Sequence, residues 1–143
     1  MAETEIEIAA SPEVVWSVLS DPYAYASWVV GTKRIRGADA GFPEVGTRFY
    51  HSLGIGPITL SDSTSVLKSD PPRLLSLDAR MGALGSARVD LELRDHGTGT
   101  LVHMTETGAR GPSRILAPAG DLLLRGRNVW SLERLKEIAE RRA

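Results

Sequence analysis

The order of strand-like and helix-like segments constrains this chain more than any other feature of its sequence. Six segments between residues 33 and 107 have the alternation or the β-branched composition of strands, and turn residues such as Asp70-Pro71-Pro72 separate them. They cover residues 33–36, 47–53, 58–68, 74–80, 87–94 and 100–107. Because each strand follows the last with no helix between them, we expect neighbouring strands to pair antiparallel.

The two ends of the chain add one more strand and the helices. Residues 4–8 alternate strictly, which predicts a strand with Ile6 and Ile8 facing inward. Ser11-Pro12 has the pattern of a helix start, and Asp21-Pro22 ends that helix and starts a second short one over residues 23–29. From about Ser113 the sequence is helical to its end, and we expect Pro118 and Gly120 to kink or interrupt the beginning of this helix.

These elements predict a single α+β domain over residues 1–143. A long helix needs a surface for its apolar face, where Leu132, Leu135 and Ala139 lie at helical spacing with Asn128. A curved antiparallel sheet needs cover on its concave side. We therefore expect a sheet of about seven strands wrapped around the C-terminal helix, with two short helices after the first strand.

Composition excludes several classes of protein. The chain is 42% hydrophobic and 24% charged with a net charge of −1, which argues against a disordered chain and against nucleic acid as a partner. The absence of cysteine excludes disulfides, a thiolate zinc site and a cysteine nucleophile. The acidic N-terminus is unlike a signal peptide, and no apolar run is long enough for membrane insertion. We expect a soluble cytoplasmic protein, a monomer or a homodimer, without a cofactor.

Several local sequence marks occur in a characteristic order along nearly the whole chain. They are residues 11–16 (SPEVVW), Asp21-Pro22 followed by Trp28, residues 45–49 (VGTRF), 70–75 (DPPRLL), 97–100 (GTGT), and Arg127-Asn128, Ser131-Leu132 and Leu135 in the final segment. In this order the chain resembles the START/SRPBCC superfamily of helix-grip proteins, which includes the birch pollen allergen and the polyketide cyclase/dehydrase-like proteins. The resemblance implies a cavity between sheet and long helix that binds a lipid, polyketide, quinone or similar molecule. Some members are enzymes and others are carriers, so the fold does not choose between them.

Strand alternation selects the polar residues that could face such a cavity. In residues 47–53 the inward set is Phe49, His51 and Leu53 or the alternate residues, and the two clear hydrophobes favour the first set. An imidazole there could act as a general base, or it could be a histidine with satisfied hydrogen bonds or partial exposure and no chemical role. His103 on the last strand is expected to face outward, and His96 lies in a turn where we expect no chemical role.

The last strand presents the second candidate for acid–base chemistry. Val102 with Met104 is the more apolar inward choice, which also turns Glu106 toward the cavity. A glutamate beside apolar walls suits acid–base work, whereas one at the rim would lie in water or pair with arginine. Asn128 on the inward face of the long helix needs hydrogen-bond partners, either a ligand or a backbone group. No spacing typical of a metal site occurs, so we expect no metal.

The sequence thus predicts a binding protein, with two alternatives. The predicted cavity lining is Trp28, Phe49, His51, Leu77, Leu91, Met104, Glu106, Asn128 and Leu132. The first alternative is a polyketide cyclase- or dehydratase-like enzyme that uses His51 or Glu106 as acid or base. The second is a protein-interaction module, in which the basic face of the last helix with Arg134, Arg141 and Arg142 contacts an acidic partner.

Overall fold

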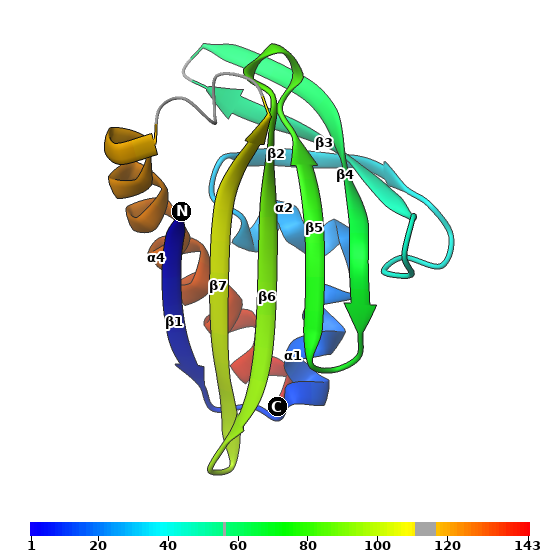
Figure 1. The fold of residues 1–143 in the computed structure, drawn as a ribbon. Helices are drawn as coiled ribbons and strands as arrows, with labels where there is room; N and C mark the ends of the chain where they lie inside the picture. Colours follow the sequence, from blue (N-terminus) through cyan, green and yellow to red (C-terminus); the bar gives the residue numbers. More distant parts are fainter. Residues whose placement is uncertain (56, 111–116) are drawn as a thin grey trace.

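The computed structural model describes residues 1–55, 57–110 and 117–143. Within these residues seven strands form one antiparallel sheet in the order β1-β7-β6-β5-β4-β3-β2 (Figure 1). The strands are β1 (Ala2–Ile8), β2 (Thr32–Ala38), β3 (Arg48–Ile55), β4 (Ile58–Asp70), β5 (Leu74–Arg80), β6 (Ser86–His96) and β7 (Gly99–Arg110). The helical segments are α1 (Pro12–Leu19), the 3-10 turns η1 (Pro22–Ala24) and η2 (Gly82–Leu84), α2 (Tyr25–Trp28) and α4 (Ala117–Arg142).

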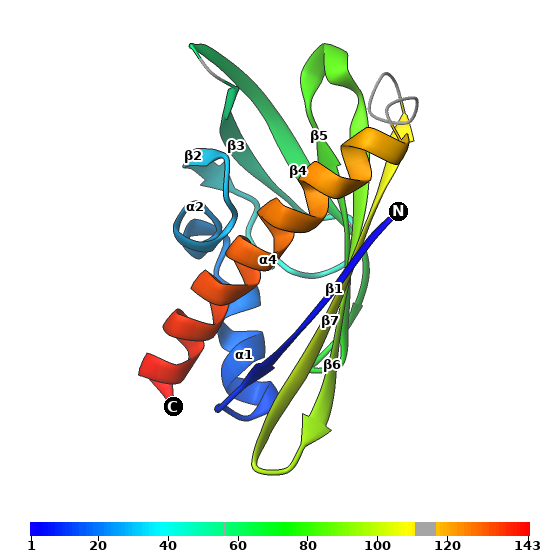
Figure 2. The same cartoon turned by 90° about the vertical axis from the view of Figure 1, so that its left-hand side faces the viewer.

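The sheet is curved, and the main helices cover its concave side. Figure 2 shows α4 crossing this side of the sheet diagonally, with α1 and α2 on the same side. The N- and C-terminal elements are adjacent, since β1 pairs with β7 and α4 packs against β1. This arrangement is the predicted α+β helix-grip fold.

Local signals in the sequence explain how the short helices begin. The hydroxyl of Ser11 accepts a hydrogen bond from the Val14 amide at 3.3 Å, and Pro12 occupies the first turn of α1. The Asp21 carboxylate accepts from the Tyr23 amide at 3.1 Å and caps η1. The predicted second helix is therefore present, as a 3-10 turn that continues into the single turn of α2.

The long helix differs from its prediction at its beginning. The expected start near Ser113 lies outside the described residues. From Ala117 the helix runs without interruption to Arg142, so the expected interruption at Pro118 and Gly120 is absent. Proline is tolerated in the first turn of a helix because its missing N–H would have no intrahelical partner there.

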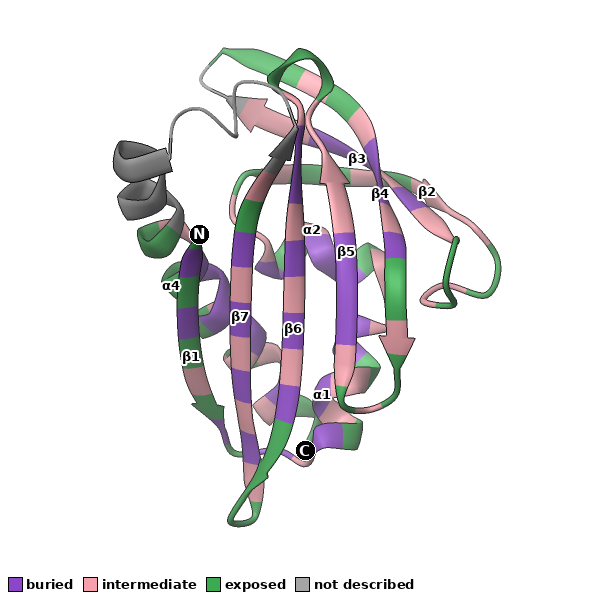
Figure 3. Cartoon of the chain, in the orientation of Figure 1, coloured by how far each residue is buried: buried purple, intermediate pink, exposed green. Residues whose placement is uncertain are grey.

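The burial pattern confirms the predicted faces of the sheet and of α4. Buried and partly exposed residues alternate along β6 and β7 (Figure 3), and Val102, Met104 and Glu106 are buried while His103 faces outward. Over residues 125–142 of α4 the buried residues are Asn128, Ser131, Leu132, Leu135 and Ala139. No helix in the described part of the chain is long and apolar enough to cross a lipid bilayer.

Candidate functional site

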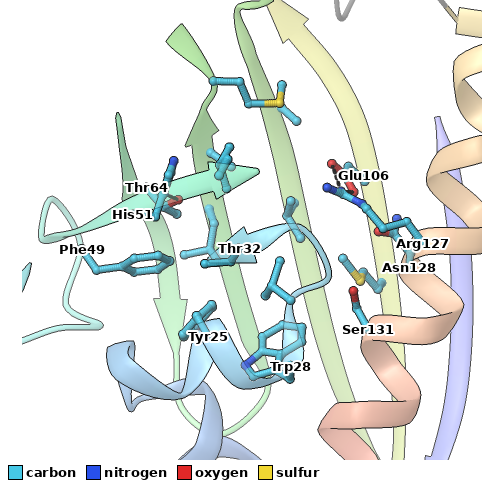
Figure 4. A pocket seen from close by; sticks show the side chains of 18 residues that line it. Tyr25, Trp28, Thr32, Phe49, His51, Thr64, Glu106, Arg127, Asn128 and Ser131 are labelled. Carbon is cyan, nitrogen blue, oxygen red and sulfur yellow. Dashed lines mark hydrogen bonds and ion pairs between the residues drawn. The ribbon is translucent and has the colours of Figure 1, made fainter. Parts of the chain in front are cut away.

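A cavity of about 80 Å³ lies between the concave face of the sheet and the helices α2 and α4 (Figure 4). Its walls are mainly apolar, with polar side chains on two of them. The lining residues are Tyr25, Trp28, Val29, Thr32, Phe49, His51, Leu53, Thr64, Leu77, Ala79, Met81, Ala87, Val89, Met104, Glu106, Arg127, Asn128 and Ser131. The predicted void between sheet and terminal helix is therefore present in the structure.

The cavity brings together seven of the nine residues that the sequence placed in its lining. The exceptions are Leu91 and Leu132, which are fully buried in the hydrophobic core and do not line the cavity. Both face inward as expected, but the cavity occupies only part of the space between sheet and helix. Packed core side chains fill the rest of that space.

Aromatic side chains form one wall of the cavity. The Tyr25 ring lies with its centroid 5.1 Å from that of Trp28 and 4.6 Å from that of Phe49. The Tyr25 hydroxyl donates to the Leu19 carbonyl at 2.7 Å, and burial raises the pKa of this phenol, as does the Asp21 carboxylate. Tyr25 is therefore held as a neutral donor inside the protein, and this aromatic wall carries no charge.

The His51 imidazole is buried, and both its ring nitrogens have partners. Nε2 lies 2.9 Å from the Arg80 carbonyl oxygen, and Nδ1 lies 3.0 Å from the Thr64 hydroxyl. Because a carbonyl can only accept, Nε2 carries the proton and Nδ1 accepts from Thr64. Burial lowers the pKa of His51, so the ring is neutral at pH 7.

Glu106 is buried on β7 and pairs with Arg127 of α4. The guanidinium Nη2 donates to both carboxylate oxygens, at 2.7 and 2.9 Å. The Glu106 side chain is 4% exposed, whereas that of Arg127 is 35% exposed and reaches water. Glu106 faces inward as strand alternation predicts, whereas Arg127 was not among the predicted lining residues, because its contact with Glu106 depends on how α4 packs on the sheet.

Asn128 lies beside this ion pair and has no hydrogen-bond partner within the described residues. It is 1% exposed, and neither its amide nitrogen nor its carbonyl oxygen is bonded. The neighbouring Ser131 hydroxyl accepts from the Val30 amide at 3.0 Å. Figure 4 shows Arg127, Asn128 and Ser131 on one wall with Glu106, across the cavity from His51 and Thr64.

The other candidates from the sequence lie away from the cavity. His103 pairs with Glu5 at 3.2 Å on the outer face of the sheet, and no three possible metal ligands cluster among the described residues. On the outer face of α4, Arg134 stacks over the exposed Trp130 ring at 5.0 Å. The basic residues Arg141 and Arg142 lie 3.6 Å from Glu137 and Asp21, respectively, so these charges have partners within the chain.

A sequence match over nearly the whole chain identifies the family. Residues 2–140 match the family described as polyketide cyclase / dehydrase and lipid transport. The chain belongs to this family. The match includes every lining residue of the cavity and confirms the resemblance that the local sequence marks indicated. No curated protein matches the chain.

Solved structures confirm the fold of this polyketide cyclase/dehydrase family member. A protein from Nitrosomonas europaea has a TM-score of 0.77 at 17% identity, over 98% of this chain and 94% of the other. StfQ, a di-domain ARO/CYC protein from the steffimycin biosynthetic pathway, has a TM-score of 0.73 at 14% identity, over 98% of this chain and 50% of its own. Ara h 8.0201 has a TM-score of 0.70 at 11% identity, over 96% and 95%. At these identities the likeness concerns the fold alone.

Proposed function

We propose that this protein binds a small amphipathic molecule in the cavity between its sheet and α4. The supporting observation is the cavity itself, whose walls are mostly apolar with polar groups concentrated on two sides. Apolar area supplies affinity in such sites, and a few polar groups orient the ligand. The family description includes lipid transport, which agrees with this role.

The size of the cavity limits what it admits without rearrangement. At about 80 Å³ it has roughly half the volume of a 150 Å³ cavity that binds benzene. A larger ligand requires the walls to move apart, and Met81 and Met104 in the lining have the flexible side chains for this. Burying about 200 Å² of a short alkyl chain contributes roughly 5 kcal/mol before ordering costs, which suggests weak to moderate affinity.

The geometry supports binding more than catalysis. A proton-transferring residue must reach the substrate with a free donor or acceptor. Both ring nitrogens of His51 are bonded within the protein, and both carboxylate oxygens of Glu106 accept from Arg127. His51 would have to break one of its contacts before it could act as acid or base, and the Glu106 carboxylate is already bound by a guanidinium.

Trp28 provides a direct test because it lines the cavity, whereas Trp130 is exposed. The double variant Trp16→Phe/Trp130→Phe leaves Trp28 as the only tryptophan. Fatty acids, quinones and aromatic polyketides are titrated into this protein while its emission is recorded. A saturable change with at least one compound supports the proposal, and no change with the whole panel contradicts it.

A matched pair of substitutions separates binding in the cavity from binding elsewhere. Ala87 lines the cavity, so Ala87→Leu fills part of it, whereas Ala83 is exposed in η2 and Ala83→Leu leaves the cavity unchanged. We expect Ala87→Leu to weaken binding at least tenfold and Ala83→Leu to leave it within twofold. Equal affinities in the two variants would place the ligand outside the cavity.

A further inference from the structure

The geometry of the α4 wall points to a class of ligand. We propose that the cavity selects a neutral molecule whose polar end carries a hydrogen-bond donor and an acceptor side by side, as in a primary carboxamide. Asn128 is the residue that holds this end. The inference rests on the proposed function and adds the chemistry of the ligand to it.

The first observation is the unpaired amide of Asn128. Its side chain is 1% exposed and lines the cavity, yet neither its NH₂ group nor its carbonyl oxygen is bonded to a described residue. Buried side-chain amides normally have partners, because an unmade hydrogen bond there is costly. A group that is buried, unpaired and on the wall of a cavity is placed to meet a molecule inside it.

The second observation is the charge of the lining. Glu106 and Arg127 are the charged side chains that line the cavity among the described residues, and they neutralise each other at 2.7 and 2.9 Å. His51 is neutral because its burial lowers its pKa. A charged ligand would lose its hydration and would find the opposite charge in the lining already neutralised within the Glu106–Arg127 ion pair. The lining therefore disfavours an anion as well as a cation.

The Asn128 side-chain amide requires two kinds of hydrogen-bond partner. The Asn128 NH₂ group donates and its carbonyl oxygen accepts, so a ligand must offer both functions at one end to pair with it. A primary carboxamide does so with two antiparallel hydrogen bonds. An ester offers acceptors only and leaves the Asn128 carbonyl unpaired. A water molecule on such an amide would be replaced without loss only by a group that makes the same hydrogen bonds.

The test compares three ligands with the same hydrocarbon chain. Hexanamide carries donor and acceptor, methyl hexanoate carries acceptors alone, and hexanoate is an anion at pH 7. Each is titrated into ¹⁵N-labelled protein and followed by ¹H–¹⁵N correlation spectra. We expect hexanamide to bind about tenfold more tightly than hexanoate and about fivefold more tightly than methyl hexanoate, with the Asn128 NH₂ resonances shifting.

Two substitutions on opposite walls locate the selectivity. Asn128→Leu removes the amide at similar size, and we expect it to reduce the preference for hexanamide over methyl hexanoate to about one. Thr64→Val also replaces a polar lining group, on the wall of His51, and should leave that preference within twofold. The preference is a ratio measured within one protein, so a change in stability of a variant does not alter its meaning.

The contradicting outcomes are distinct from those of the proposed function. If hexanoate binds most tightly, or if Asn128→Leu keeps the preference for hexanamide, the ligand class is wrong and binding in the cavity stands. If none of the three binds while Trp28 responds to another compound, the ligand class is again wrong. If neither experiment shows binding, both proposals are overturned.

Discussion

Arg127 of α4 and Glu106 of β7 form an ion pair that joins the long helix to the sheet beside the cavity. One guanidinium nitrogen donates to both carboxylate oxygens, at 2.7 and 2.9 Å. The Glu106 side chain is buried, and the Arg127 side chain is about one-third exposed. The Arg127 charge offsets the free-energy cost of burying the Glu106 charge in the lining. The ion pair therefore contributes to stability only when both residues are present.

We predict that Arg127→Met destabilises the protein by about 2 kcal/mol, because it leaves the Glu106 charge buried without a counterion. Fully buried pairs cost more when broken, and the exposure of Arg127 reduces the effect. Urea unfolding monitored by circular dichroism measures it. The double variant Glu106→Gln/Arg127→Met should recover part of the loss.

Arg141→Met serves as the control for this prediction. Arg141 lies 3.6 Å from Glu137 with its side chain 76% exposed, so its loss should change the free energy of unfolding by less than about 0.5 kcal/mol. Equal effects of Arg127→Met and Arg141→Met would show that burial of the Glu106 charge does not influence the free energy of unfolding.

Which side chains of a strand face inward could be predicted, because successive side chains point to opposite faces of the sheet. Two hydrophobes on the same face as His51 were enough to place it inside, and Val102 with Met104 did the same for Glu106. The inward face of α4 followed from helical spacing in the same way. These are local properties of the chain, and the fold confirms them.

The partners of these residues could not be predicted, because they depend on how distant elements pack. Arg127 and Glu106 are 21 residues apart, and they meet only because α4 crosses the sheet at β7. For the same reason the sequence could not show where the cavity ends along an inward face. Val89 lines the cavity, whereas Leu91, two residues further on the same face of β6, belongs to the core.

The burial of His51 makes stability depend on pH. Burial lowers the pKa of this imidazole in the folded protein, whereas the unfolded chain binds the proton near pH 6.5. The unfolded state therefore takes up a proton first as the pH falls. The free energy of unfolding decreases below about pH 6.5, by at most about 1.4 kcal/mol per pH unit, until the folded state is also protonated.

Urea unfolding between pH 5 and pH 8 measures this dependence, and His51→Gln is its control. The variant keeps His96 and His103, so it retains the contributions of the other two histidines. We expect the slope below pH 6.5 to be smaller in His51→Gln than in the wild type. Identical slopes would mean that the His51 ring is protonated as easily in the folded protein as in the unfolded chain.

Replacement by alanine is expected to have opposite effects on stability at two glycines, Gly99 and Gly126. A Cβ atom on Gly99 would overlap the backbone carbonyl oxygen of Ile8, which cannot move without shifting the end of β1. Gly126 is exposed on α4, and a Cβ there would meet nothing within 4 Å. We expect Gly99→Ala to destabilise the protein by about 2 kcal/mol. Gly126→Ala should stabilise it by about 0.5–1 kcal/mol, since alanine restricts the unfolded chain and favours the helix.

Thermal and urea unfolding of the two alanine variants give this comparison directly. Both replace a glycine by the same residue, so a general effect of the added methyl group would move them in the same direction. Loss of stability in Gly126→Ala would contradict the helical, open environment of this position.

The unpaired amide of Asn128 also affects the stability of the protein without ligand. A buried amide with no partner among the described residues lowers stability, and a leucine of similar size removes both polar atoms. We expect Asn128→Leu to raise the free energy of unfolding by about 1 kcal/mol, measured in urea without ligand. Lower stability would mean that the amide is well bonded in the folded state. A more stable variant that no longer prefers hexanamide would show that the chain keeps Asn128 at a cost in stability for the sake of recognition.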